Sequence, residues 1–185
     1  MKFLKALILL SVLLSFSASA LLEVNIIKSK EELFPVVIAP FEVIGDAHQG
    51  ADIANIIKDN LNRSGQFNAL STNELVTNQI DFNFWQEHKK DAVVFGKIEQ
   101  VSSKVFNIYI YIYDVFSEKS LYSKKIAVHN SGIRRIAHYL SDRIYYVLLG
   151  QKGSFDTRLS YVTVSESKKG NRTYRLQISD SDGYN

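Results

Sequence analysis

The stretch SGIRRIAHYLSDRIYYVLLG (131–150) carries the most regular pattern in the chain. Apolar residues recur in it every three or four positions, which is the spacing that aligns side chains on one face of an α-helix. Ser131 is the expected N-cap, and Gly150 is the expected left-handed residue that ends the helix. The apolar stripe consists of Ile133, Ile136, Ala137, Leu140, Ile144, Val147 and Leu148.

Polar residues fill the remaining positions of this segment. A helix with a single apolar face packs that face against the rest of its domain. It does not span a membrane. We therefore predict a surface helix that closes an α/β domain. The residues predicted to stay in water are Arg134, Arg135, Ser141, Asp142 and Arg143.

Two segments before this helix show clear strand patterns. Residues 34–41 read FPVVIAPF, a continuous apolar run with the length and β-branched content of a strand that is buried on both faces. Residues 106–116 alternate isoleucine with tyrosine. The isoleucines predicted to face the helices are Ile108, Ile110 and Ile112. The tyrosines predicted to face solvent, with a partner surface as the alternative, are Tyr109, Tyr111 and Tyr113.

Weaker patterns complete one domain over residues 21–150. Further strands are predicted at 22–27, 67–70, 91–101 and 121–128, and further helices at 53–61 and 81–90. Asp46 and Gln49 form a candidate capping box within a loop predicted at 42–50. The predicted fold class is α/β, a two-layer sandwich of a mixed β-sheet with two to three helices.

A different architecture begins after the long helix. Residues 151–157 are predicted as a linker, and two short strands at 158–165 and 174–179 flank a polar turn. An isolated two-stranded hairpin is marginally stable in water, so this one is expected to need strands beyond Asn185. Residues 158–185 are therefore predicted to be the incomplete start of a second, all-β domain.

The N-terminus carries a predicted signal peptide over residues 1–20. Lys2 and Lys5 precede an apolar core, and a run of small residues that ends at Ala20 closes it. The apolar core is shorter than the roughly 20 residues that a bilayer requires, so cleavage after Ala20 is favoured over a membrane anchor. No cysteine follows for lipid attachment, so we predict a released protein with no membrane insertion after signal removal. The bacterial periplasm is the predicted location, although the signal alone would also permit other secreted destinations.

Composition narrows the classes of function. Removal of Lys2 and Lys5 lowers the basic residues from 22 to 20 against 19 acidic ones, which leaves a net charge of +1. A near-neutral chain gives no electrostatic case for nucleic acid or anionic lipid as a partner. The chain has no cysteine, which excludes disulfides, thiolate zinc sites and thiol catalysis.

No motif indicates an enzyme, a cofactor or a metal. The histidines predicted to lie at the surface or at helix ends, because they lack metal-ligand spacing, are His48, His88, His129 and His138. Asp180, Asp182 and Gly183 predict a tight turn rather than a calcium loop. The loop 45–50 opens a helix but lacks the motifs of phosphate-binding loops. A ligand-binding or hydrolytic domain that uses this loop remains one hypothesis for the function.

Seven segments, taken in order along the chain, carry a family resemblance. They are APF (39–41), DIANII (52–57), NLNRSGQF (60–67), DAVVFG (91–96), RIAHYLSD (135–142), GQKGSFDTR (150–158) and ISDSDGYN (178–185). Together they resemble the TolB family, the periplasmic proteins of the Tol-Pal envelope system. The resemblance implies an N-terminal α/β domain followed by a six-bladed β-propeller. Residues 158–185 would then be the first strands of a truncated propeller.

The resemblance also implies partners and a role. The segment implied to bind the C-terminal domain of TolA is Leu21, Leu22, Glu23, Val24, Asn25, Ile26 and Ile27. An extended segment of this kind can add to a partner's sheet edge. The family's propeller binds the lipoprotein Pal, so Pal binding is expected only if a propeller is supplied. The expected protein is a non-enzymatic periplasmic adaptor, without cofactor, for outer-membrane integrity and invagination during cell division.

Overall fold

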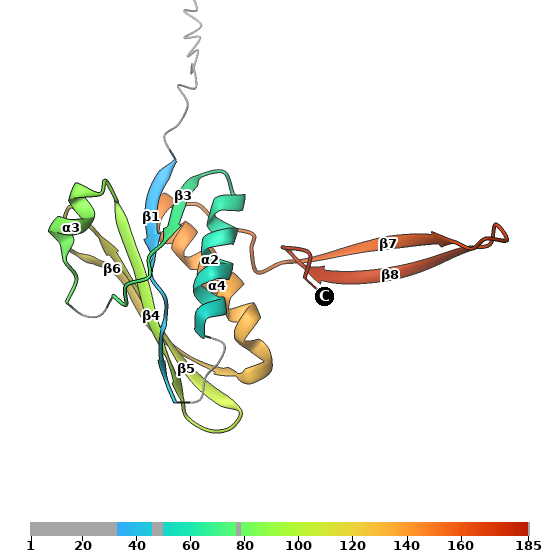
Figure 1. Cartoon of the computed structure of the whole chain (residues 1–185), viewed down its shortest axis with the longest axis horizontal. Helices are drawn as coiled ribbons and strands as arrows, with labels where there is room; N and C mark the ends of the chain where they lie inside the picture. Colours follow the sequence, from blue (N-terminus) through green and yellow to red (C-terminus); the bar gives the residue numbers. More distant parts are fainter. Residues whose placement is uncertain (1–32, 46–49, 77–78, 185) are drawn as a thin grey trace, which may run out of the picture. The chain divides into compact units, whose positions relative to one another are not determined.

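The computed structural model describes residues 33–45, 50–76 and 79–184 (Figure 1). The predicted signal peptide, the predicted strand at 22–27 and the candidate capping box lie outside these residues. The elements, in chain order, are β1 (Phe34–Ile38), β2 (Glu42–Ile44), α2 (Gly50–Arg63), β3 (Phe67–Ser71), α3 (Phe82–Glu87), β4 (Ala92–Gln100), β5 (Val105–Asp114), β6 (Ser120–His129), a 3-10 turn (Asn130–Gly132), α4 (Ile133–Leu149), β7 (Arg158–Glu166) and β8 (Arg172–Asp180).

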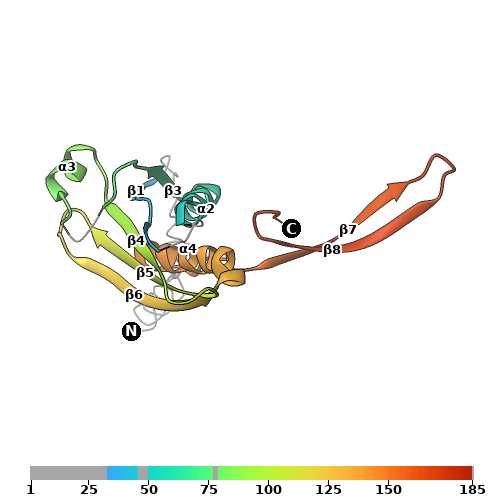
Figure 2. The same cartoon turned by 60° about the horizontal axis from the view of Figure 1, so that its bottom comes forward.

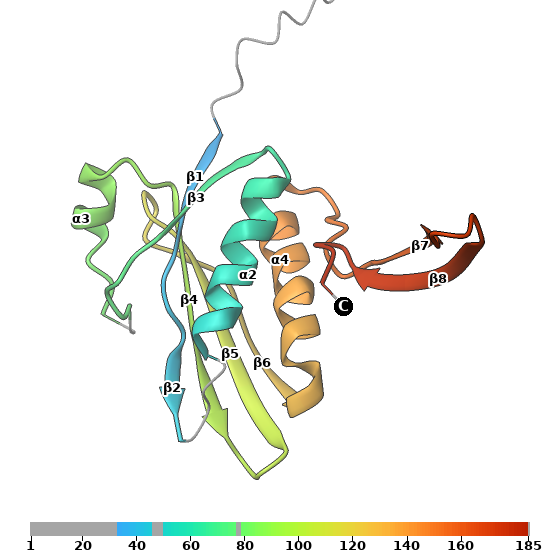
Figure 3. The same cartoon turned by 45° about the vertical axis from the view of Figure 1, so that its right-hand side comes forward.

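The first six strands form one mixed sheet in the order β3-β1-β4-β5-β6, with β2 also paired to β4 (Figure 3). β1 pairs in parallel with β3 and β4, whereas β4, β5 and β6 form an antiparallel meander. The parallel pairs arise because chain segments that contain α2 and α3 separate β1, β3 and β4. The predicted α/β fold with a mixed sheet is therefore confirmed.

α2 and α4 lie side by side on one face of the sheet (Figures 1 and 3). The isoleucines of β5 are fully buried beneath these helices, as predicted. Ala137, Leu140 and Ile144 of the α4 stripe are also fully buried. This apolar layer is the main core of the protein.

The opposite face of the sheet carries a smaller apolar cluster. Trp85 of α3 packs there with Val93 and Phe95 of β4. Tyr111 stacks on Phe95 with ring centroids 5.1 Å apart, and Tyr113 joins the same cluster. These two tyrosines lie on the opposite face from the β5 isoleucines, as predicted, but the prediction that they face solvent is only partly correct, because the segment around α3 partly covers this part of the sheet.

Two local predictions also differ from the structure. Glu42–Ile44 was expected in a loop but forms β2, which pairs with β4 through Glu42↔Lys97 and Ile44↔Glu99. The side chains of β2 are exposed, so its sequence shows no alternation of apolar and polar residues. Only its backbone pairing with β4 defines it as a strand. Ser131 does not cap α4, because a 3-10 turn precedes the helix and Gly132 occupies the cap position. Gly150 ends the helix in the left-handed conformation, as predicted.

β7 and β8 form a separate antiparallel hairpin with nine residue pairs, from Arg158↔Asp180 to Glu166↔Arg172 (Figure 2). The predicted hairpin is confirmed. Its apolar side chains are largely exposed, including Leu176 at 73 % and Val162 at 57 %. Within the described residues, no helix is both long and apolar enough to cross a membrane.

Candidate functional site

Polar residues of α4 hold the two chain segments that surround the hairpin. We call this set of contacts the α4 clamp; it comprises Arg134, His138 and Asp142 of α4, residues 151–157 and the turn Asp180–Tyr184. The three helix residues are spaced four apart, so they lie on one side of α4 beside the apolar stripe.

Asp142 anchors the segment between α4 and β7. Its carboxylate accepts hydrogen bonds from the backbone N–H groups of Phe155 at 2.8 Å and Asp156 at 3.1 Å. Phe155 is buried, and its ring meets the edge of Tyr145 with centroids 5.8 Å apart. Gly153 lies so close to Asp142 that a Cβ at this position would overlap the carboxylate. The linker is therefore seated on α4 by specific contacts.

Arg134 anchors the turn that follows β8. Its guanidinium pairs with both Asp180, at 3.4 Å, and Asp182. The same group lies 3.8 Å from the ring centroid of Tyr184. Ser181 in this turn donates from its hydroxyl to the Phe155 carbonyl at 2.6 Å, so the turn and the linker are also joined to each other. The predicted tight turn at Asp180 and Asp182 is confirmed by the Tyr184 N–H bond to the Asp182 carboxylate at 3.1 Å.

His138 lies at the centre of the clamp and is 2 % exposed. The Asn60 side-chain amide donates to Nδ1 of His138 at 2.9 Å and to the Ser141 hydroxyl at 2.9 Å. Arg63 donates to the other end of the same amide, Oδ1, at 2.7 Å. This network assigns the lone pair to Nδ1 and the proton to Nε2.

The electrostatics of the clamp keep His138 neutral. Burial lowers the pKa of the imidazole, and the nearby Asp182 and Asp180 carboxylates offset only part of this effect. Nε2 has no hydrogen-bond partner and lies 3.7 Å from an Asp182 oxygen and 3.9 Å from an Asp180 oxygen. The prediction that His138 is a surface or helix-end histidine is therefore wrong, because the linker and the turn cover this side of α4.

The linker and the turn also change the exposure of several α4 residues that were predicted to stay in water. Ser141 is fully buried, and Arg134 and Asp142 are partly buried. Arg135 and Arg143 are exposed, as predicted. A signal for the clamp was present in the sequence, since Arg134, His138 and Asp142 recur every four residues beside the apolar stripe.

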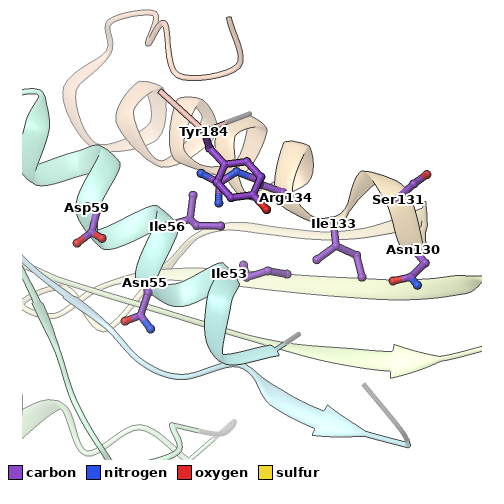
Figure 4. Close-up of a pocket in the computed structure, with 9 residues that line it drawn as sticks. All are labelled: Ile53, Asn55, Ile56, Asp59, Asn130, Ser131, Ile133, Arg134 and Tyr184. Atoms are coloured by element: carbon purple, nitrogen blue, oxygen red, sulfur yellow. The ribbon is translucent and has the colours of Figure 1, made fainter. Parts of the chain in front are cut away.

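A cavity of about 480 Å³ lies between α2 and the start of α4 (Figure 4). Its lining residues are Ile53, Asn55, Ile56, Asp59, Asn130, Ser131, Ile133, Arg134 and Tyr184. Ser131 lies 3.0 Å from the His129 imidazole, and both residues are exposed. The contacts described for His129 include no carboxylate that would orient it as a catalytic base, so this pair acts as a local turn cap.

The sites predicted from the sequence fall elsewhere. Leu21–Ile27, the predicted partner-binding segment, lies outside the described residues. Of the loop 45–50, positions 46–49 are likewise outside, so the ligand-binding alternative stays a hypothesis from the sequence. His88 and His129 are exposed, as predicted. Neither belongs to the His138–Asp180–Asp182 group, which the sequence reasoning missed.

The fold and the α4 clamp together define the class of protein, an α/β domain whose last helix contacts the segments before and after the β7–β8 hairpin. Comparison with known proteins identifies the family within this class. The chain belongs to the TolB family, because the model of the TolB amino-terminal domain matches residues 22–121. The family predicted from the sequence is thus confirmed.

Individual relatives agree with this assignment. The Tol-Pal system protein TolB of Ruthia magnifica is 55 % identical over 179 residues, which cover 97 % of this chain and 42 % of the relative. The protein of the same name from Vesicomyosocius okutanii is 52 % identical and is covered to 39 %. The crystal structure of TolB from Acinetobacter baumannii superposes with a TM-score of 0.69 at 32 % identity, covering 82 % of this chain and 37 % of that one. The chain thus spans about two fifths of the length of these relatives.

Substitution of Asp142 tests the clamp. We expect Asp142→Asn to lower the free energy of unfolding by about 1–2 kcal/mol, because an amide has a single neutral oxygen, so one of the two backbone N–H groups loses its acceptor and meets the NH2 group instead. Amide hydrogen exchange should accelerate at Phe155 and Asp156. Asp156→Asn is the matched control, since its carboxylate pairs with the exposed Arg135 and should cost less than about 0.5 kcal/mol. Equal effects of the two variants would contradict the anchoring role of Asp142.

Proposed function

We propose that this chain is a non-enzymatic adaptor of the Tol-Pal envelope system that acts in the periplasm. The observation that carries the proposal is the 55 % identity over 97 % of the chain to a protein named for this system. The described residues are consistent with it, because the polar groups of α4 are engaged in internal contacts and not in a nucleophile–base arrangement. The role proposed is support of outer-membrane integrity and of invagination during cell division.

The proposed contact with TolA uses residues 21–27 as an extended arm. Leu22, Val24 and Ile26 alternate with other residues, a pattern that suits addition to a sheet edge of the partner through main-chain hydrogen bonds.

A titration with the C-terminal domain of TolA from the same organism tests this arm. We expect the chain that starts at Leu21 to bind, and the chain that starts at Lys28 to lose about 100-fold in affinity, or about 2.7 kcal/mol. Calorimetry measures both, and thermal unfolding confirms that the shorter chain keeps its fold. Glu23→Gln in the longer chain is the control, because it leaves the apolar alternation intact. Equal affinity of the two chains would reject the arm as the TolA contact.

The remaining predictions on targeting and partners are proposed with it. Cleavage after Ala20 is tested by the mass of the chain recovered from a periplasmic extract. We propose that residues 158–185 are the first strands of a β-propeller, and that the 185 residues alone do not bind Pal. Saturable binding of Pal to this chain would contradict the second statement.

A further inference from the structure

The imidazole of His138 presents an unpartnered nitrogen to two carboxylates. His138 is 2 % exposed, and its Nε2 atom makes no hydrogen bond. One Asp182 oxygen lies 3.7 Å from Nε2 and one Asp180 oxygen lies 3.9 Å from it. One atom from each of these three side chains lies within 4.8 Å of the other two. A buried polar atom without a partner is rare in folded proteins and calls for a physical explanation.

These separations fit a bound metal ion better than a bridging water. Nitrogen and oxygen ligands lie about 2.0–2.2 Å from Zn²⁺, so two ligands at a tetrahedral angle are about 3.3–3.6 Å apart. A water molecule at a hydrogen-bond distance of about 2.8 Å would hold its two partners about 4.6 Å apart at the same angle. The observed 3.7 and 3.9 Å differ from the metal geometry by only a few tenths of an ångström.

We propose that His138, Asp180 and Asp182 form a binding site for a divalent transition-metal cation of the Zn²⁺ type. The ion would join α4 to the turn that follows β8. One imidazole nitrogen with two carboxylate oxygens is a ligand set that suits Zn²⁺, whereas Ca²⁺ requires six to eight oxygens. This proposal concerns the clamp and does not depend on the TolA contact.

The two carboxylates already have one close cation. The guanidinium of Arg134, which also stacks on Tyr184, pairs with the same Asp180 and Asp182 oxygens that face Nε2, so a bound ion has to displace it from them. Arg158 reaches Asp180 only at 4.0 Å and is largely exposed.

The hydrogen-bond network can supply the tautomer that metal binding requires. Coordination through Nε2 moves the proton to Nδ1, which then needs an acceptor. A half-turn of the Asn60 amide would present its oxygen to Nδ1, and the Ser141 hydroxyl, which now donates to the Ala137 carbonyl at 2.8 Å, would have to turn to donate to that same oxygen. Arg63, which now binds the Asn60 oxygen, is exposed and can turn to solvent.

A cavity borders the site. It has a volume of about 200 Å³ and is lined by His138 and Asp180 together with Arg135, Phe155, Asp156, Thr157 and Arg158. Nε2 itself is buried, so side chains at this border have to shift before an ion reaches the imidazole.

Metal titration of the chelator-treated chain 21–185 tests the site. Co²⁺ should bind with one equivalent and produce the visible absorption of a low-symmetry nitrogen–oxygen site, and Zn²⁺ should displace it and raise the unfolding temperature. Asp182→Asn and His138→Gln should each weaken binding at least 10-fold, while Asp156→Asn, in the same cavity, should leave it unchanged. Ca²⁺ at the same concentration should have no effect.

A substitution of Asn60, which contacts the proposed ligand His138, is expected to change the metal affinity in the opposite direction. Misfolding would not produce such an increase in affinity. Asn60→Asp should tighten metal binding, because a carboxylate accepts the Nδ1 proton and raises the basicity of Nε2. Circular dichroism checks that every variant is folded. Absence of cobalt absorption in the unsubstituted chain would overturn the proposal. Equal Co²⁺ affinity of the unsubstituted chain and the folded His138→Gln variant would overturn it as well, by placing the ion elsewhere.

Discussion

Ile144→Asp is expected to unfold a large part of the population at neutral pH. Ile144 is fully buried on the α4 stripe, within the apolar layer between the helices and the sheet. An aspartate there places a charged carboxylate among the apolar side chains of the main core. We expect a loss of about 4 kcal/mol or more. That loss is comparable to the whole stability of many domains, about 5–15 kcal/mol.

Arg143→Asp is the matched control, because it introduces the same residue one position earlier in the same helix. Arg143 is exposed and donates to the Tyr139 hydroxyl at 3.1 Å. The loss of this surface contact should cost less than about 1 kcal/mol. Urea unfolding followed by circular dichroism measures both variants. Similar midpoints for the two would show that the buried stripe of α4 is wrongly placed.

Gly96→Ala is expected to cost about 3 kcal/mol, although it adds a single methyl group. Gly96 lies in the middle of β4, opposite Ile110 of β5. A Cβ at this position would overlap the backbone carbonyl of Tyr109 and the ring of Phe41. The ring can turn, but the carbonyl belongs to the neighbouring strand and can move only if the sheet is distorted. Glycine is therefore required by close packing and not by a left-handed backbone.

Gly170→Ala separates these two reasons for a glycine. Gly170 has a φ of +78° in the turn between β7 and β8, with no atom within 4 Å of an added Cβ. Its cost should be the conformational one, about 1 kcal/mol. Chemical unfolding of the Gly96→Ala chain should show a clearly larger loss. A loss at Gly96 no greater than that at Gly170 would mean that the β4–β5 contact adapts freely.

Patterns with a period carried most of the fold prediction. The α4 stripe and the isoleucine alternation of β5 each identify a buried face, because burial repeats along a helix or strand with that element's own geometry. β2 escaped prediction because its side chains are exposed and its pairing with β4 involves backbone groups common to every residue. The contacts of Tyr111 and Tyr113 escaped for another reason, since the segment that covers them comes from α3.

The candidate site was much less predictable than the fold. Asn60 and His138 are 78 positions apart, and Arg134 and Asp182 are 48 positions apart. No pattern among residues close together in the sequence predicts contacts between positions so far apart. The four-residue recurrence of Arg134, His138 and Asp142 marks a polar side of α4 but does not say that anything packs on it.

By itself, the sequence determined the existence of α4 and its end at Gly150, the β4–β5–β6 strands, the hairpin and the family, because each depends on short-range pattern or on similarity of sequence. Only the tertiary structure decided that the polar side of this helix is covered. The linker and the turn after β8 return to α4, bury His138 and bring two aspartates to its ring. Burial and pairing of charges depend on which distant segments meet, and that is a property of the packed chain.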